Sequence, residues 1–188
     1  MKLKSKVKIV ALTGSPGVGK STVAEILRER GYDVRKVDRL AEKHNCIIDE
    51  YEDEKVIDIE KLKRKFKIEV STEKGVIIVE GHLSHLLDPD VVVVLRCNPL
   101  VLKRRLKKKG WTESKILENT EAELIDYILI ESMELGKKIY EVDTTSLDPS
   151  KVADIVEEII KENSNNYKPG KIDWISELKD DIEKVIRK

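Results

Sequence analysis

The stretch Gly14-Ser15-Pro16-Gly17-Val18-Gly19-Lys20-Ser21 decides the fold of this chain. It matches G-x-x-x-x-G-K-[ST], the pattern of a loop that holds nucleotide phosphates. Its glycines let the backbone curl so that successive N–H groups point at phosphate oxygens. In this pattern the lysine, here Lys20, reaches the β- and γ-phosphates, and the hydroxyl of Ser21 ligates Mg²⁺. The stretch therefore predicts a site for Mg²⁺ and a nucleoside triphosphate.

The segments on either side of this loop fit that prediction. Residues 7–12 are mostly apolar and predict a buried strand. Residues 22–30 have an apolar face at helical spacing, and Gly31 is expected to end that helix. A helix that starts near Lys20 adds its positive end to the anion site. Strand, loop and helix in this order favour a phosphate site over a glycine-rich turn without a ligand.

Length, charge and cysteine content limit the class of protein. The 188 residues are expected to form one domain with a sizeable core. Lysine plus arginine and aspartate plus glutamate both number 36, which argues against a dominant nucleic-acid surface but leaves local basic stretches open. Cys46 and Cys97 share no metal-ligand spacing, so free thiols in a reducing cytoplasm are expected. No signal peptide or transmembrane helix is expected.

The remaining pattern alternates strands and helices. Further strands are expected at 32–37, 75–80, 91–95 and 138–143. Helices are expected after a cap at Asp38, at Ile59–Phe66 within an otherwise irregular charged stretch over 45–70, from Asn98 to Gly110, over 112–135, and after a cap at Ser150. This alternation predicts an α/β fold, a parallel sheet with helices on both faces.

Two candidate residues follow the apolar strand at 75–80. Glu80 ends that strand, where an acidic residue of a phosphate-loop enzyme sits near Mg²⁺, usually through water. The alternative is a strand-end surface acid. His82 follows where ligands bind in open α/β sheets, so it is a catalytic candidate. A hydrogen-bonded structural histidine is the other interpretation.

The helix expected after Asn98 is strongly basic, with Lys103-Arg104-Arg105 and Lys107-Lys108-Lys109. One interpretation is a clamp that neutralises the charge of a phosphoryl group in transfer. The other is a surface for RNA or a solvated helix face. Its position after a strand favours the clamp for Arg105, and direct RNA contact stays open.

Two segments lie outside the alternating pattern. The charged stretch over 45–70 is a candidate substrate-binding flap, and its alternative is a solvated connection. Residues 163–170 predict a linker, and the apolar spacing of 172–188 predicts a helix after it. That helix is expected to pack back on the core, with partner binding as the alternative.

With these pieces assembled, the chain resembles an archaeal-like member of the adenylate kinase isoenzyme 6 family, also called the coilin-interacting nuclear ATPase family. The likeness runs from about residue 7 to residue 162. It rests on Leu12–Thr22, on Val79-Glu80-Gly81-His82, and on Val94-Leu95-Arg96 followed by Leu102, Arg105-Leu106 and Gly110-Trp111. The later Glu118-Asn119 and Glu121-Ala122-Glu123 also fit the family's pattern.

The resemblance implies a nucleoside-monophosphate-kinase fold with a short lid. It implies a kinase domain over 1–162, with a monophosphate-binding insert at about 37–60 and a lid at about 108–118. Residues 163–188 would be a linker and a C-terminal helix that packs on the domain or extends it. The implied activities are ATP:AMP phosphotransfer and ATP hydrolysis, with Mg²⁺. A small-subunit ribosomal protein is the implied partner, in small ribosomal subunit maturation.

The same resemblance assigns site residues. ATP would be held by Gly17, Val18, Gly19, Lys20, Ser21, Thr22 and Lys109. The monophosphate would be held by Asp38 and Arg39. Mg²⁺ would be held by Ser21 and, through water, by Glu80, and the catalytic set would be Lys20, His82 and Arg105.

Three positions depart from the family's pattern. Lys109 and Glu80 stand where an arginine and an aspartate are usual, and the lysine lacks the bidentate fork of arginine. Glu42 replaces an arginine expected to contact AMP, although Arg39 lies three residues earlier on the same helix face. Two alternatives therefore stay open. One is an assembly ATPase acting on a ribosomal protein, and the other is a kinase for a different small molecule.

Overall fold

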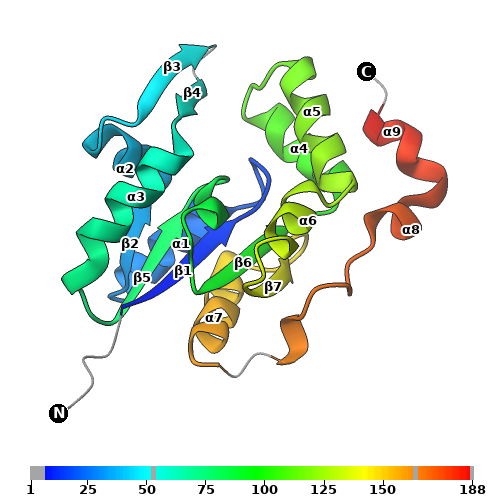
Figure 1. The fold of residues 1–188 in the computed structure, drawn as a ribbon. Helices are drawn as coiled ribbons and strands as arrows, with labels where there is room; N and C mark the ends of the chain where they lie inside the picture. Colours follow the sequence, from blue (N-terminus) through cyan, green and yellow to red (C-terminus); the bar gives the residue numbers. More distant parts are fainter. Residues whose placement is uncertain (1–6, 52–53, 163–164, 187–188) are drawn as a thin grey trace.

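A five-stranded parallel sheet organises the molecule (Figure 1). The computed structural model describes residues 7–51, 54–162 and 165–186. Within them the sheet runs in the order β2-β5-β1-β6-β7, and each neighbouring pair is parallel. Its strands are β1 Lys8–Thr13, β2 Asp33–Lys36, β5 Val76–Glu80, β6 Val91–Arg96 and β7 Lys138–Asp143. The predicted α/β fold with a parallel sheet is confirmed.

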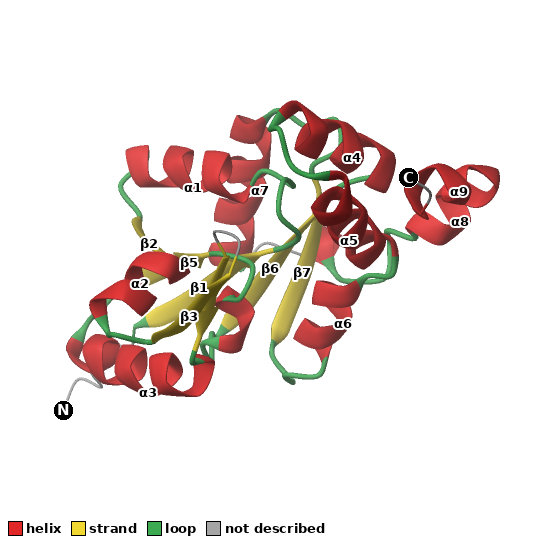
Figure 2. Ribbon diagram, turned by 90° about the horizontal axis from the view of Figure 1, so that it is seen from above, coloured by secondary structure: helices red, strands yellow, loops and turns green. Residues whose placement is uncertain are grey.

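Helices cover both faces of the sheet (Figure 2). The helices of the described ranges are α1 Lys20–Glu29, α2 Val37–Lys43, α3 Ile59–Glu69, α4 Pro99–Lys108, α5 Glu113–Leu124, α6 Tyr127–Met133, α7 Pro149–Ile160, α8 Trp174–Leu178 and α9 Ile182–Ile186. Short 3-10 turns lie at Val70–Thr72, Ser84–Leu86, Asn165–Tyr167 and Lys179–Asp181. None of the helices in the described ranges is long and apolar enough to span a bilayer.

The central strand β1 is buried on both sides. Val10 and Leu12 pack in the core layer that α1 and α7 cover. Ile9 packs with side chains of α2 and α3, and Ala11 packs with Leu129 of α6. This two-sided burial explains why the strand reads as a continuous apolar run, as central parallel strands do.

The charged stretch after α2 is more regular than expected. Residues Ile47–Tyr51 (β3) and Glu54–Ile57 (β4) form an antiparallel hairpin, so the irregular segment predicted there was wrong in part. Ile47 pairs with Ile57, and both pack against the core, which anchors the base of the hairpin. Glu52 and Asp53 of the acidic cluster lie outside the described residues.

Two helix caps differ from the prediction. Asp38 lies in the first turn of α2 and does not cap it, because the helix already begins at Val37. Ser150 lies inside α7. The cap is Asp148, whose carboxylate accepts a hydrogen bond from the N–H of Ser150 at 2.9 Å. Pro149 takes the first helical position, where a missing N–H costs nothing.

The single helix expected over 112–135 is two helices. Thr112 caps the first of them, α5, which begins where the helix start was predicted. The chain then turns at Asp126, whose φ of 58° is left-handed and cannot continue an α-helix. The Asp126 carboxylate forms an ion pair with the buried Arg96, which holds this turn in place.

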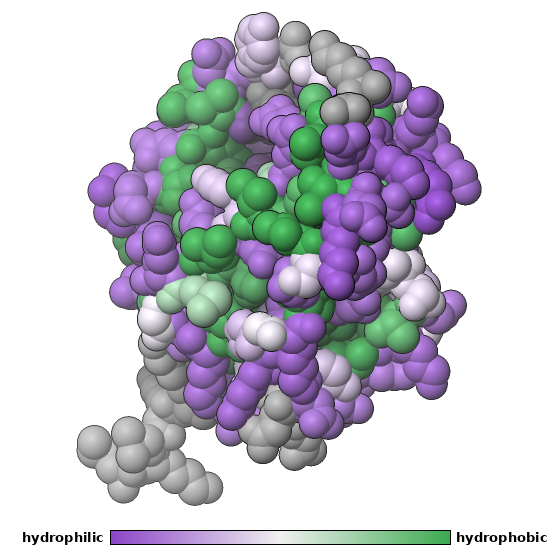
Figure 3. All heavy atoms as spheres, turned by 90° about the vertical axis from the view of Figure 1, so that its right-hand side faces the viewer, coloured by the Kyte–Doolittle hydropathy of each residue, from purple (hydrophilic) through white to green (hydrophobic). Residues whose placement is uncertain are grey.

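The C-terminal segment, residues 165–186, also departs from one continuous helix. It forms α8 and α9, which are separated by a turn where Lys179 has φ of 35°. Trp174, Leu178 and Val185 are buried, and α9 packs against α4 and α5. On the face that carries this segment, apolar side chains gather in the middle with charged side chains around them (Figure 3).

Candidate functional site

The loop between β1 and α1 lies at the carboxyl ends of the parallel strands. The β3–β4 hairpin lies on one side of it and α4 with α5 on the other (Figure 1). Gly14 has φ of +133°, and a Cβ there would lie 2.3 Å from the carbonyl oxygen of Leu95. Only glycine allows this close approach of two backbones.

A Gly14→Ala variant is expected to lose about 3 kcal/mol of unfolding free energy, because a backbone clash adds to the strain of positive φ. Gly31→Ala is the matched control. Gly31 also has positive φ, but no atom of a described residue outside its immediate neighbours lies within 4 Å of the place a Cβ would take. The control is expected to lose only about 1 to 2 kcal/mol. Chemical denaturation measures both, and equal losses would contradict the clash.

Lys20 is buried beneath this loop. Its Nζ donates hydrogen bonds to the carbonyl oxygens of Gly14 at 2.8 Å and Ser15 at 3.0 Å. Burial lowers the pKa of Lys20 to about 8, and the nearby carboxylates of Glu80 and Glu123 limit that decrease. The ammonium is therefore placed at the loop in a poorly solvated position, where its charge acts strongly on a bound anion.

The charges that act on Lys20 locate two further predicted residues. Lys109, at the end of α4, lowers the pKa of Lys20, and Asp38, in the first turn of α2, raises it. Both effects are smaller than those of burial, Glu80 and Glu123. Lys109 and Asp38 thus lie within electrostatic range of Lys20.

Ser21 and Glu80, the two residues predicted to hold Mg²⁺, lie close together. The Ser21 hydroxyl donates a hydrogen bond to Oε1 of Glu80 at 3.1 Å. Glu80 is nearly buried at the end of β5, beside Leu12 of β1. One hydroxyl and one carboxylate suit Mg²⁺, which keeps waters and takes further oxygens from substrate phosphates. No group of three acidic, histidine or cysteine side chains able to hold a metal occurs in the described ranges.

Arg105 lies against the loop, with its guanidinium on backbone oxygens. It donates to the carbonyl of Val18 at 3.4 Å and to those of Thr144 and Thr145 at 2.8 and 3.1 Å. Thr144 Oγ1 also donates to the Val18 carbonyl, at 2.7 Å. Arg105 and the segment after β7 therefore support the phosphate loop from the α4 side.

His85, which was not a candidate from the sequence, is buried beside the start of the phosphate loop. The side chain of His82 is exposed, and its carbonyl accepts a hydrogen bond from Thr13 Oγ1 at 3.0 Å. His85 is fully buried, with Nδ1 3.1 Å from Thr13 Oγ1 and Nε2 2.6 Å from Glu131. Thr13 directly precedes the loop, so His85 and Glu131 help to fix where the loop begins.

The α2 face predicted to hold a monophosphate carries an ion-pair network. Arg39 donates to Glu42 at 2.9 Å, and Lys55 of β4 donates to the same carboxylate. Arg39 and Glu42 thus share one helix face, as their spacing predicts. The guanidinium of Arg39 is largely exposed, at 78% of its side-chain surface.

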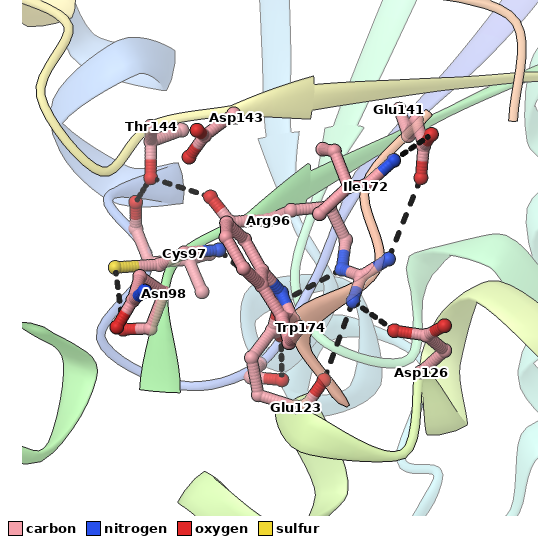
Figure 4. Close-up of polar contacts among 12 residues, drawn as sticks. Arg96, Cys97, Asn98, Glu123, Asp126, Glu141, Asp143, Thr144, Ile172 and Trp174 are labelled. Atoms are coloured by element: carbon pink, nitrogen blue, oxygen red, sulfur yellow. Dashed lines mark hydrogen bonds and ion pairs between the residues drawn. The ribbon is translucent and has the colours of Figure 1, made fainter. Parts of the chain in front are cut away.

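A buried cluster of charged side chains, which was not predicted from the sequence, lies behind the loop (Figure 4). Arg96, at the end of β6, is 1% exposed and pairs with Glu123 at 2.7 Å and Glu141 at 3.4 Å. Its guanidinium lies 5.9 Å from the ring centroid of Trp174. Two features could have indicated this cluster. Arg96 ends an otherwise apolar strand, and Glu123 lies on the buried face of α5.

Comparisons with known proteins agree with this architecture. A family model described as an AAA domain matches residues 10–126. A protein of Archaeoglobus fulgidus named putative adenylate kinase is 55% identical over 96% of this chain and 99% of its own length. A protein of the same name from Methanocaldococcus jannaschii is 43% identical, over 88% of this chain and 92% of its own.

Solved structures show the same fold at low identity. Shikimate kinase from Acinetobacter baumannii superposes with a TM-score of 0.58 and 16% identity, over 85% of this chain and 96% of its own. Thymidylate kinase from Candida albicans superposes with a TM-score of 0.53 and 16% identity, over 86% of this chain and 94% of its own. The chain belongs to the AAA domain family and to the family of the archaeal proteins named putative adenylate kinase.

Proposed function

We propose that this protein transfers the γ-phosphoryl group of Mg-ATP to AMP. The observation that carries the proposal is the geometry at one loop, where Lys20 is hydrogen-bonded to the Gly14 carbonyl and Ser21 is hydrogen-bonded to Glu80 at 3.1 Å. The names of the archaeal relatives support adenylate kinase as the class.

Phosphoryl transfer asks the protein mainly for positioning and charge stabilisation. The loop N–H groups and Lys20 would hold the β- and γ-phosphates, with Lys109 as a second cation from the end of α4. Mg²⁺, held by Ser21 and through water by Glu80, would neutralise the charge that develops between the phosphates. Arg105, which supports the loop through the Val18 carbonyl, would also meet the transferred group during closure. Closure of the lid at about 108–118 would exclude water.

The acceptor is proposed to bind between α2 and the loop. Asp38 is within electrostatic range of Lys20, so the start of α2 lies near the loop. Arg39, one residue further along α2, is the cation proposed for the AMP phosphate. It would exchange the Glu42 carboxylate for that phosphate, because both are oxygen anions that a guanidinium fork can bind.

An acceptor panel tests this proposal. The purified protein is given Mg-ATP labelled in the γ-phosphate, with AMP, CMP, GMP, UMP or no acceptor, and the products are separated by chromatography. The proposal expects label in ADP, with AMP as the best acceptor. Label in a different product would make the protein another small-molecule kinase, and label in no nucleotide product would overturn the proposal.

The resemblance to the isoenzyme 6 family adds two finer proposals, ATP hydrolysis and a role in small ribosomal subunit maturation. His82 would position the attacking water, because it follows the end of β5 where the phosphates are expected. The arm without acceptor measures hydrolysis as labelled phosphate, and His82→Gly is expected to remove it. Co-purification of a small-subunit ribosomal protein that ATP releases would support the second proposal. Hydrolysis that is intact in His82→Gly would remove the role of His82.

A further inference from the structure

The phosphate loop is bound to α5 through its second residue. Ser15 is buried, and its Oγ donates a hydrogen bond to Oε2 of Glu123 at 2.6 Å. The carbonyl of the same serine accepts the hydrogen bond from Lys20 Nζ at 3.0 Å. The position of Ser15 therefore affects both the course of the loop and the placement of Lys20.

Glu123 is in turn fixed by several donors. Its Oε1 accepts hydrogen bonds from Nε of Arg96 at 2.7 Å, the N–H of Cys97 at 3.1 Å and Nε1 of Trp174 at 3.1 Å. The residue is 3% exposed, so these protein donors stand in place of water. A buried carboxylate held by this many donors is a rigid anchor, because any movement would leave polar groups unpaired.

One of these donors comes from the C-terminal segment, far away in the sequence. Trp174 is buried and lies over Arg96. The backbone just before Trp174 is fixed by two hydrogen bonds, because the N–H groups of Lys171 and Ile172 donate to Oε1 of Glu141 at 2.7 and 3.2 Å. The hydrogen bonds run from Trp174 to Glu123 and from Ser15 to Glu123, so the segment after residue 165 is connected to the phosphate loop through one carboxylate.

We propose that Glu123 is a positioning residue that holds the phosphate loop in its ATP-binding form, and that Trp174 of the C-terminal segment supports it. The inference rests on the proposed function for the identity of the nucleotide. Loosening this connection would disturb the phosphate cradle and Lys20. It would leave the acceptor region on α2 unchanged, because no residue of that region contacts the anchor among the described contacts.

Two small substitutions test the connection. Ser15→Ala removes the hydroxyl, and Trp174→Phe removes the indole N–H while it keeps an aromatic ring on Arg96. Each is expected to raise the Kd for Mg-ATP about three- to tenfold, the scale of one buried hydrogen bond. The Kd is measured by calorimetry, and the KM for AMP is expected to stay within about twofold, because only the phosphate loop is affected. Glu123→Gln, which removes the carboxylate itself, is expected to have the larger effect on Kd.

The double variant tests whether Ser15 and Trp174 affect ATP binding through the same residue, Glu123, or independently of each other. If both act through Glu123, the double variant is expected to weaken ATP binding by less than the product of the single effects. Tyr167→Phe is the matched control, because it removes an aromatic hydroxyl of the same segment that bonds Glu158 on the surface. That control is expected to bind ATP like the unaltered protein.

The outcomes distinguish this inference from the proposed function. An unaltered protein that binds Mg-ATP but phosphorylates no monophosphate would defeat the proposed function and leave the anchor testable by Kd. Single variants that fold with unchanged melting temperature and bind ATP within twofold of the unaltered protein would overturn the anchor. Equal increases in the Kd for ATP and the KM for AMP would also overturn it, since they would indicate general loosening. If Trp174→Phe does not fold, Ser15→Ala decides the test.

Discussion

Lys20→Met is expected to lower phosphoryl transfer by about a thousandfold or more, because it removes a preorganised charge from the site of the transferring group. The ammonium of Lys20 lies beneath the loop, fixed by the carbonyls of Gly14 and Ser15. It is poorly solvated, as its lowered pKa of about 8 reflects, so no water molecule readily replaces its action on the γ-phosphate. Steady-state ADP formation with Mg-ATP and AMP measures the loss.

Lys65→Met is the matched control for this variant. Lys65 is exposed on α3, so the same substitution there removes a charge that the solvent screens. Circular dichroism of both variants separates loss of catalysis from loss of fold. Lys20→Met is expected to fold, because methionine has a similar length and leaves no charge to bury. Turnover at the unaltered rate in folded Lys20→Met would contradict the placement of the reaction at this loop.

Arg96→Met is expected to lower the unfolding free energy by about 3 to 5 kcal/mol, because it leaves buried carboxylates without their cation. Glu123 and Glu141 both pair with Arg96, and the side chains of all three are at most 3% exposed. Methionine fills the volume but supplies no donor, so both carboxylates keep their desolvation cost. Guanidinium denaturation followed by circular dichroism gives the difference.

Arg28→Met serves as the comparison. Arg28 pairs with Glu25 on α1, where the two side chains are 38% and 57% exposed, and it also donates to the Val34 carbonyl at 3.3 Å. Such pairs contribute about 0 to 1 kcal/mol, so this variant is expected to stay near the unaltered protein. A loss of similar size in both variants would show that the buried cluster is not a special stabilising unit.

Local sequence signals were sufficient for most of the fold. The five strands of the parallel sheet and α1 follow from apolar runs and glycines close in sequence, and they formed near the predicted positions. The β3–β4 hairpin was missed because its strands mix charged with apolar residues, and Ile47 and Ile57, which pair with each other, pack against the core. The turn at Asp126 was missed because its left-handed backbone accompanies an ion pair with Arg96, which lies 30 residues earlier.

In the site, too, residues with a local sequence pattern were predicted and contacts between distant residues were not. Lys20, Ser21 and Glu80 were predicted because a known spacing and a strand end place them. The link from Ser15 to Glu123 joins residues 108 positions apart, and that from Trp174 to Glu123 joins residues 51 apart. Neither link has a local pattern, because it depends on how α5 and the C-terminal segment fold back on the sheet. Tertiary contacts of this kind appear only in the assembled structure.

The most direct test of the central claim is the balance of products from Mg-ATP, with and without AMP. ADP and inorganic phosphate are both quantified as ATP is consumed. Transfer to AMP predicts two ADP for each ATP consumed, dependence on AMP, and little phosphate. Equal amounts of ADP and phosphate, formed at a rate that AMP does not change, would contradict the account and identify the loop as the site of an ATPase.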